Sequence, residues 1–392
     1  MQLKQLSAVA SKVDIELAKI DSQVDWLTYL SPVDNDANWQ TFKDCHFSTE
    51  PNLRYLPIPE HYARLKKQVR NVPVDDVEEP ALHALFFEKR MELELQIDLV
   101  LMRNTPGFIP ISVGLFGGAE PSLLHLAKQI LHQVPLDDGP PDNSHCEDLV
   151  AAANNEFAQY RQREANFNAK VLVMDDLNSM MMVHNGDFKI ARSVHLPKER
   201  ILPLIAHEVG THVVTRYNGK CQPIKLFEYG LADYDPLQEG LGTLAEYLAG
   251  YLPPRRLRTI AARVVATELA LNRKSIVEIF QALHEEYKLP VDDAFDVAVR
   301  ASRGGGLTKD SVYLRGMREL LAYLADGGDI NFLYLGKFAI GQRASVNALL
   351  QQGWLQPAKL LPRHLLDEKS QQRLARVRNL ELRQLFQEEP EI

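Results

Sequence analysis

Apolar residues recur at helical spacing along most of this chain. Between about Gln5 and Leu30, and again from about Glu79 to Asn104, they return every third or fourth position, which is typical of one buried helix face. Similar patterns follow Pro121, span roughly Glu147 to Ala165, and continue through the C-terminal third. The sequence therefore predicts a mostly helical protein.

The pattern changes near Lys170. The segment KVLVMDD is a short continuous apolar run, which predicts a buried strand. MMMVHNGDFKIARS then places two short strand-like stretches around Asn185 and Gly186, the dipeptide favoured in tight hairpin turns. A helix carrying His207 follows. We expect an α+β fold in which a small mixed β-sheet and a hairpin lie over this helix.

Loop composition suggests four regions. The segment PLDDGPPDNSHC, Pro135 to Cys146, has the strongest turn composition in the chain. We expect a helix-rich N-terminal region over residues 1–135, a linker over 136–146, a core that carries the candidate site over 147–340, and a C-terminal helical region over 341–392.

Composition and charge limit the class of protein. Of 392 residues, 45% are apolar and 24% are charged, and the formal net charge is −8 with both signs mixed along the chain. Nucleic-acid binders usually show a concentrated basic stripe, which is missing here. No apolar run reaches transmembrane length, charges interrupt the N-terminal segment, and the three cysteines lack CxxC spacing. We expect a protein of the reducing cytoplasm that contacts neither nucleic acid nor membrane.

The segment AHEVGTH nearly matches the zinc-protease motif H-E-x-x-H. His207 and His212 are five positions apart, so a regular α-helix would place them about 140° apart around its axis. A π-bulge absorbs one extra residue and would bring both imidazoles to one face, with Gly210 relaxing the crowding. We predict a helix widened locally from Glu208 to Thr211. The alternative is a pair of core or surface histidines that bind no metal.

A catalytic zinc ion needs a third protein ligand, and Glu239 in DPLQEGLG is the best candidate. Asp235 suits the N-cap of a helix and Pro236 its first position, which places Glu239 in the first turn. Glu246 lies near the same face and is a competing ligand, or a residue that supports the ligands. The alternative role of Glu239 is interaction with the helix dipole.

The residue types at this site suggest hydrolysis. One Zn²⁺ per chain, held by two imidazoles and one carboxylate, would keep a positive charge, acidify water and polarise a carbonyl group. Glu208, next to the first histidine, would serve as general base and then as proton donor to the leaving amine. A non-enzymatic regulatory protein with a structural metal site is the alternative. Such a site normally closes its fourth position and has no use for Glu208.

HEVGTH followed by QEGLG resembles the QEGLA-motif family of zincin-like metallopeptidases, whose animal members include the microtubule-associated tyrosine carboxypeptidases. The resemblance covers most of the chain and is densest between about Lys170 and Phe338. It implies a zincin-like core, zinc ligation by His207, His212 and Glu239, and Glu208 as the catalytic residue.

The resemblance also implies removal of a C-terminal residue from a protein or peptide. We do not infer from the resemblance that tubulin is the substrate of this protein. One position departs from the motif, because Gly242 replaces the final alanine of QEGLA. We expect this change to leave the ligands untouched.

A carboxypeptidase must bind the terminal carboxylate of its substrate, commonly through Arg or Lys. SRGGGLTKDSVYLRG offers Arg303, Lys309 and Arg315 near a glycine-rich bend. Tyr313 can donate a hydrogen bond to the tetrahedral oxyanion. The alternative is a glycine loop and helix start with a solvated basic face. The hairpin before His207 would supply an edge strand for an extended peptide.

Overall fold

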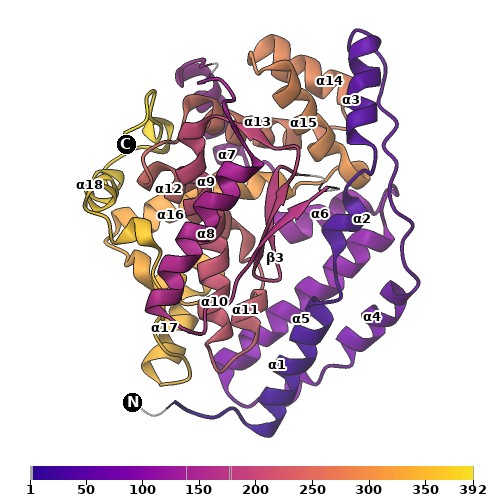
Figure 1. The fold of residues 1–392 in the computed structure, drawn as a ribbon. Helices are drawn as coiled ribbons and strands as arrows, with labels where there is room; N and C mark the ends of the chain where they lie inside the picture. The colour runs from indigo at the N-terminus through magenta and orange to yellow at the C-terminus, as the bar shows by residue number, and fades with distance from the viewer. Residues whose placement is uncertain (1–2, 138, 176, 178, 392) are drawn as a thin grey trace.

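Helices make up most of the structure, a computed structural model that describes residues 3–391 except 138, 176 and 178. Two small sheets complete an α+β fold. In Figure 1 the N-terminal helices α1, α4 and α5 gather on one side, and α17 and α18 near the C-terminus lie on the other. Within the described range, no helix is long and apolar enough to cross a membrane.

The elements follow one another in this order. The N-terminal helices are α1 (Ala8–Asp21), α2 (Trp26–Leu30), α3 (Asn35–Asp44), α4 (His61–Arg70), α5 (Pro80–Leu101), α6 (Phe108–Phe116), α7 (Pro121–Gln133) and α8 (Cys146–Arg163). The strands are β1 (Ser144–His145), β2 (Val171–Met174), β3 (Met181–His184), β4 (Asp187–Ala191) and β5 (His195–Leu196). The remaining α-helices are α9 (Ile201–Ile205), α10 (Val214–Lys220), α11 (Leu226–Tyr229), α12 (Asp235–Leu248), α13 (Pro254–Leu271), α14 (Ile276–Gln281), α15 (Val291–Ser302), α16 (Val312–Ala325), α17 (Arg343–Gln351) and α18 (Glu368–Val377).

The N-terminal helices agree with the hydrophobic pattern, apart from one break. Helices α5, α7 and α8 lie where the apolar spacing predicts them. The first predicted segment forms two helices, α1 and α2, because the chain turns after Asp21. Ser22 ends α1 with a hydroxyl that donates to the carbonyl of Lys19 at 2.8 Å, and such local hydrogen bonds compete with helix continuation.

The predicted hairpin and mixed sheet are confirmed. The strand order is β2-β4-β3, with β2 parallel and β3 antiparallel to the central β4. Asn185 and Gly186 form the turn with φ of 52° and 86°, as a turn of this type requires. Phe188 and Ile190 of β4 are fully buried. The sheet is therefore anchored through its central strand.

The expectation that the strand after Lys170 is buried was wrong. β2 is an edge strand, its residues are mostly half-buried, and Leu172 is 36% exposed. It pairs with β4 on one edge and packs against α8, so its apolar residues are covered from fewer directions than in a central strand. Asp176, near the end of the predicted strand, lies outside the described residues.

A single hydrophobic cluster connects distant parts of the chain. It includes Leu17 of α1, Phe86 of α5, Val209 beside the candidate ligands, Leu241 of α12, and Leu385 near the C-terminus. The division at residues 136–146 stays a prediction, and residue 138 in that segment is outside the described range.

Helix α12 is central to the placement of the candidate site. It contacts α16 and the π-helical segment η3 (Ala206–Val213), and β3 and β4 also contact η3. Helices α12 and α16 meet through glycine, since a Cβ at Gly316 would lie 1.8 Å from the carbonyl oxygen of Pro236. The sequence predicted Asp235 as the N-cap of α12, but Tyr234 occupies that position. The helix therefore begins one residue earlier than predicted. The predicted placement of the hairpin over the histidine helix is confirmed.

Candidate metal centre

A π-helical segment accommodates the extra residue between His207 and His212. This segment, η3, joins α9 to α10 in one continuous helix. The hydroxyl of Thr211 donates to the carbonyl of Ala206, five residues earlier, at 3.3 Å. The two imidazole rings lie 5.1 Å apart between centroids. The predicted local widening of the helix is confirmed, and it brings both histidines to one face.

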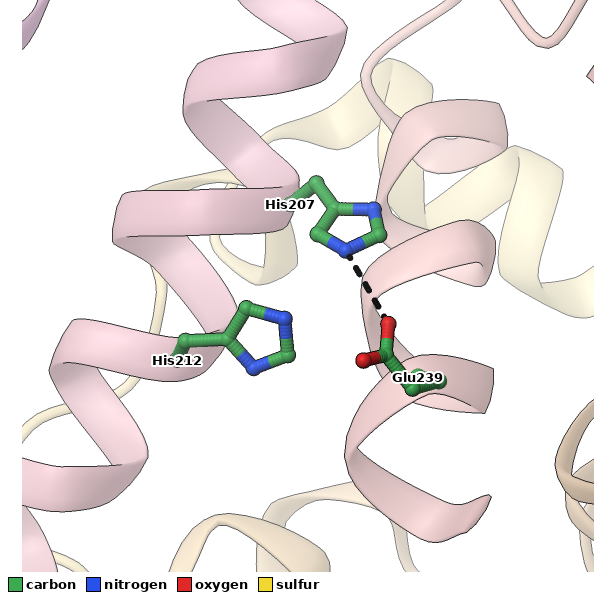
Figure 2. Close-up of side chains that lie close together, drawn as sticks. All are labelled: His207, His212 and Glu239. Carbon is green, nitrogen blue, oxygen red and sulfur yellow. Dashed lines mark ion pairs between the residues drawn. The ribbon is translucent and has the colours of Figure 1, made fainter. Parts of the chain in front are cut away.

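Glu239 of α12 approaches the same point from the opposite side. One ligand atom from each of His207, His212 and Glu239 lies within 4.8 Å of the others. Nε2 of His207 is 3.7 Å from Oε2 of Glu239. Figure 2 shows the two imidazoles on one helix facing the carboxylate on its neighbour. In the part of the chain that the structure describes, this is the one group of three such side chains that could hold a metal ion.

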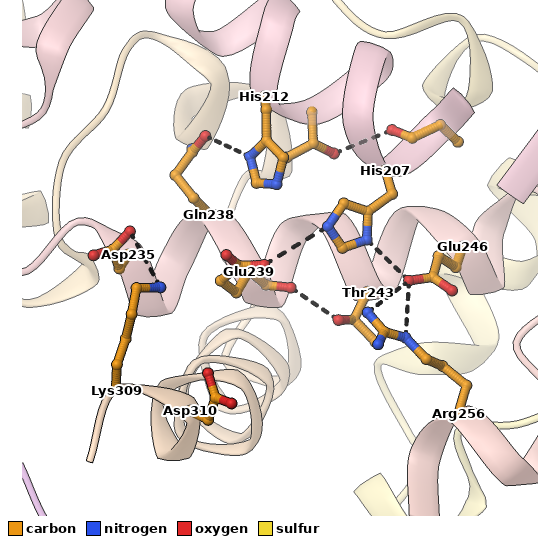
Figure 3. A network of polar contacts seen from close by, with 12 residues as sticks. His207, His212, Asp235, Gln238, Glu239, Thr243, Glu246, Arg256, Lys309 and Asp310 are labelled. Atoms are coloured by element: carbon orange, nitrogen blue, oxygen red, sulfur yellow. Dashed lines mark hydrogen bonds and ion pairs between the residues drawn. The ribbon is translucent and has the colours of Figure 1, made fainter. Parts of the chain in front are cut away.

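Glu246 supports the first histidine from outside this group. Its Oε1 accepts a hydrogen bond from Nδ1 of His207 at 2.9 Å, and its Oε2 accepts one from Arg200 at 2.7 Å. Arg256 also donates to Oε1, at 3.3 Å (Figure 3). With Nδ1 engaged, Nε2 is the atom of His207 that faces Glu239. Glu246 therefore orients a candidate ligand. Metal-binding histidines usually donate their other ring N–H to a carboxylate in this way.

Gln238 does the same for the second histidine. Its Oε1 lies 3.4 Å from Nδ1 of His212, so the amide accepts from that nitrogen and Nε2 remains free to bind (Figure 3). The sequence contained this signal only as the residue before Glu239. Arg200 and Arg256, which hold Glu246, carried no motif and were missed.

The electrostatics of the site favour a cation. Burial would lower the pKa of His207, but the carboxylates of Glu239 and Glu246 raise it to about 10. Burial lowers the pKa of His212 to about 4 and raises that of Glu208 to about 7. A divalent cation would benefit from the same negative potential and would displace the proton of His207, because ligands bind metal in the deprotonated form.

The donor set fits a catalytic zinc ion. Two imidazoles and one carboxylate are a ligand set of zinc peptidases, whereas structural zinc sites use four ligands and often cysteine. The free cysteines Cys45, Cys146 and Cys221 are not part of this group. The chemistry of the three side chains and their convergence therefore match one catalytic ion per chain.

Gly242 contacts the first histidine, contrary to the expectation that this position leaves the ligands untouched. A Cβ at Gly242 would lie 2.5 Å from Nε2 of His207 and 2.7 Å from two ring carbons. The reason is the close passage of α12 beneath the imidazole. Glycine at this position provides the space that the ring occupies.

We expect Gly242→Ala to displace the imidazole of His207 and to weaken zinc binding by about 10- to 100-fold, as changes next to a ligand usually do. Competition with a chelating indicator measures the affinity. Gly341→Ala is the matched control, because no atom lies within 4 Å of a Cβ there. If Gly242→Ala binds zinc as tightly as the control, the contact with His207 has no influence on the metal site.

Two of the four predicted substrate-facing residues lie beside the ligands. Nζ of Lys309 is 4.0 Å from Oδ1 of Asp235 and 5.9 Å from the centre of the Tyr313 ring. Figure 3 shows the charged end of Lys309 next to Asp235, and the charge of Lys309 acts on Glu239. Burial and the charge of Glu239 raise the pKa of Tyr313. The structure thus brings Lys309 and Tyr313 close to the metal-binding group.

The other two, Arg303 and Arg315, are placed differently. Arg315 donates to the carbonyl of Phe116 at 2.9 Å and to Asp233 at 3.0 Å. Arg303 is buried, and burial and the charge of Arg300 lower its pKa. None of these contacts reaches a candidate ligand. Their substrate-binding role stays a prediction without support from position.

Two cavities lie away from the candidate ligands. One of about 710 Å³ is lined by Phe332, Leu335 and Leu350 among others, and one of about 360 Å³ by residues that include Tyr55 and Gly305. Neither is lined by the candidate ligands. The case for a site therefore rests on the converging side chains and their charges.

A comparison with protein families covers the part of the chain that contains the candidate ligands. The sequence model of the family described as microtubule-associated tyrosine carboxypeptidase matches residues 40–381. A search of curated proteins found no match. The matched range contains the three candidate ligands and Glu208.

Proposed function

The chain belongs to the family of microtubule-associated tyrosine carboxypeptidases, and from this premise we propose that it is a zinc-dependent metallocarboxypeptidase with a zincin-like core. The observation that carries the proposal is the convergence of His207, His212 and Glu239 on one point. Glu208 lies next to the first ligand in the chain but outside the ligand group.

His207, His212 and Glu239 would hold the zinc ion. When bound, zinc would supply a Lewis acid that polarises the scissile carbonyl group and acidifies water. Glu246 keeps Nδ1 of His207 engaged and Gln238 does so for His212, so that each ring presents Nε2. The protein thus orients both imidazoles before a substrate arrives.

Glu208 would perform the proton transfers. As general base it takes a proton from the attacking water, and as general acid it delivers that proton to the leaving amine. Tyr313, on which the charge of Glu239 acts, would donate its hydroxyl hydrogen to the oxyanion of the tetrahedral intermediate. These steps break the peptide bond and add one water molecule across it.

The substrate would be the C-terminus of a protein or peptide. The family description names tyrosine, so a terminal tyrosine is the first residue to test. An extended peptide could pair with β3, an edge strand that contacts η3. Of the three basic residues predicted from the sequence, Lys309 has the best position to contact such a substrate.

A regulatory protein that binds metal without catalysis is the competing function. The two functions give Glu208 different roles. A metal site that serves only structure gains nothing from a carboxylate beside its ligands, whereas a peptidase needs one as general base. To test the proposal, zinc-loaded protein is incubated with peptides that have free C-termini, and the products are identified by mass spectrometry. We expect loss of one C-terminal residue. Internal cleavage contradicts the carboxypeptidase assignment, and a zinc-loaded protein that cleaves nothing favours the regulatory function.

A further inference from the structure

Arg263 of α13 is a buried arginine whose charge is not matched by hydrogen bonds. Its side chain is 9% exposed. Within the described part of the chain, Nε and Nη1 have no hydrogen-bond acceptor. A buried charged donor without an acceptor is energetically costly, since it loses its contacts with water. Such a group is expected where a ligand supplies the missing acceptor.

Asp310, the carboxylate nearest to Arg263, is already committed to another residue. Arg300 donates to both its oxygens, from Nε at 2.5 Å and from Nη2 at 2.9 Å. Nε of Arg263 lies 4.0 Å from Oδ2 of Asp310, which is too long for a hydrogen bond. Asp310 therefore lowers the energetic cost of the buried charge of Arg263 but accepts no hydrogen bond from its guanidinium.

The guanidinium of Arg263 packs on the ring of Tyr313, the residue predicted to stabilise the oxyanion. It lies 4.5 Å from the centre of the Tyr313 ring, and Nζ of Lys309 lies 5.9 Å from that centre. The charge of Glu239, a candidate zinc ligand, acts on the same tyrosine. The charge of Lys309 acts on Glu239 as well (Figure 3). Two cations thus flank Tyr313 at the edge of the metal-binding group.

The chemistry of this arrangement fits a carboxylate. A planar guanidinium binds a carboxylate through two parallel N–H···O bonds, which a lysine cannot do. Of the arginines predicted from the sequence, Arg315 already donates to Phe116 and Asp233. Arg303 is buried, where the charges of Arg300, Asp310 and Tyr55 act on it.

We propose that Arg263 binds the terminal α-carboxylate of the substrate and thereby restricts the enzyme to free C-termini. This assignment rests on the proposed carboxypeptidase function. In a C-terminal substrate the α-carboxylate belongs to the residue that is removed, so it must be held close to the scissile bond. Tyr313 contacts Arg263 and is also the residue predicted to stabilise the oxyanion. The carboxylate site and the oxyanion site would therefore be adjacent.

The test measures binding, so that it does not depend on turnover. Two peptides of one sequence ending in tyrosine, one with a free carboxylate and one with a carboxamide, are titrated calorimetrically into zinc-loaded Glu208→Gln protein. We expect the free acid to bind about 10- to 100-fold more tightly, the range for hydrogen bonds to a charged group. Adding Arg263→Gln should reduce this ratio to about threefold or less, mainly by weakening the free acid.

Arg255→Gln on the same helix is the matched control, because Arg255 pairs with Asp293 at 2.7 Å and should not affect the ratio. Circular dichroism checks that each variant folds. Arg263→Lys keeps the charge without the planar fork, so its ratio should be intermediate, and it replaces Arg263→Gln if the latter does not fold.

Three outcomes separate this assignment from the proposed function. A full ratio in folded Arg263→Gln or Arg263→Lys protein overturns the assignment. Equal binding of the acid and the amide to the Glu208→Gln protein also overturns it, whether or not the wild type cleaves peptides. A ratio that depends on Arg263, found together with a wild type that cleaves nothing, supports the carboxylate site and contradicts the proposed enzyme.

Discussion

Replacing Glu208 by glutamine is expected to lower kcat for peptide cleavage by about 10²- to 10⁴-fold, the usual contribution of general acid–base catalysis, while zinc stays bound. Glutamine keeps the shape of the side chain but cannot accept a proton from water. Glu208 is not part of the ligand group, so the metal should remain. The measurements are kcat with a peptide that has a free C-terminus, and the zinc content of the purified variant.

Glu285 offers a matched control for this substitution. It also follows a histidine and lies in a second π-helical segment, Ala282–Glu286, but it is exposed and no candidate ligands surround it. Glu285→Gln should therefore cleave at the wild-type rate. If Glu208→Gln retains kcat within about threefold of the wild type, Glu208 is not the general base, and the proposed mechanism fails at this step.

Replacing His212 by alanine is expected to reduce bound zinc from about one ion per chain to almost none and to abolish peptide cleavage. Only His207 and Glu239 would remain as ligands, and two protein ligands do not make a stable catalytic zinc site. Zinc content after dialysis and the rate of peptide cleavage measure the two effects.

The same variant should lose the dependence of thermal stability on zinc. An ion that binds only the folded chain stabilises the folded state by about 4 kcal/mol when the free ion concentration is 1,000 times Kd. We therefore expect Tm of the wild type to rise when zinc is added, and Tm of His212→Ala to stay constant.

His284→Ala is the control for both measurements. The imidazole of His284 bonds to the carbonyl of Leu289 at 2.8 Å and lies outside the ligand group. Its loss should lower Tm slightly and leave the response to zinc intact. One tightly bound zinc ion per chain in His212→Ala protein would place the metal elsewhere and remove the structural basis of the proposed function.

Much of the local structure could be predicted because it depends on neighbouring residues. The hairpin follows from Asn185 and Gly186, which adopt positive φ at little cost. The widened helix follows from the spacing of His207 and His212 once both must face one ion. Glu239 could be identified because its motif lies a short distance along the chain.

Other features depend on how separate helices pack, and the one-dimensional pattern does not contain that information. Burial of β2 was overestimated because an edge strand and a central strand can have the same apolar residues. Gly242 was thought to leave the ligands untouched, since its contact with His207 arises only when α12 packs against η3.

The sequence by itself determined most of the long helices, the hairpin and the residue types that can hold zinc and transfer protons, because periodicity, turn chemistry and ligand spacing act over short distances. The tertiary structure decided which distant side chains complete the site. It assigned Glu246 to the orientation of His207 and placed Arg263 beside Tyr313. The physical reason is that burial, charge pairing and close helix contacts are set by packing, which brings together residues far apart in the chain.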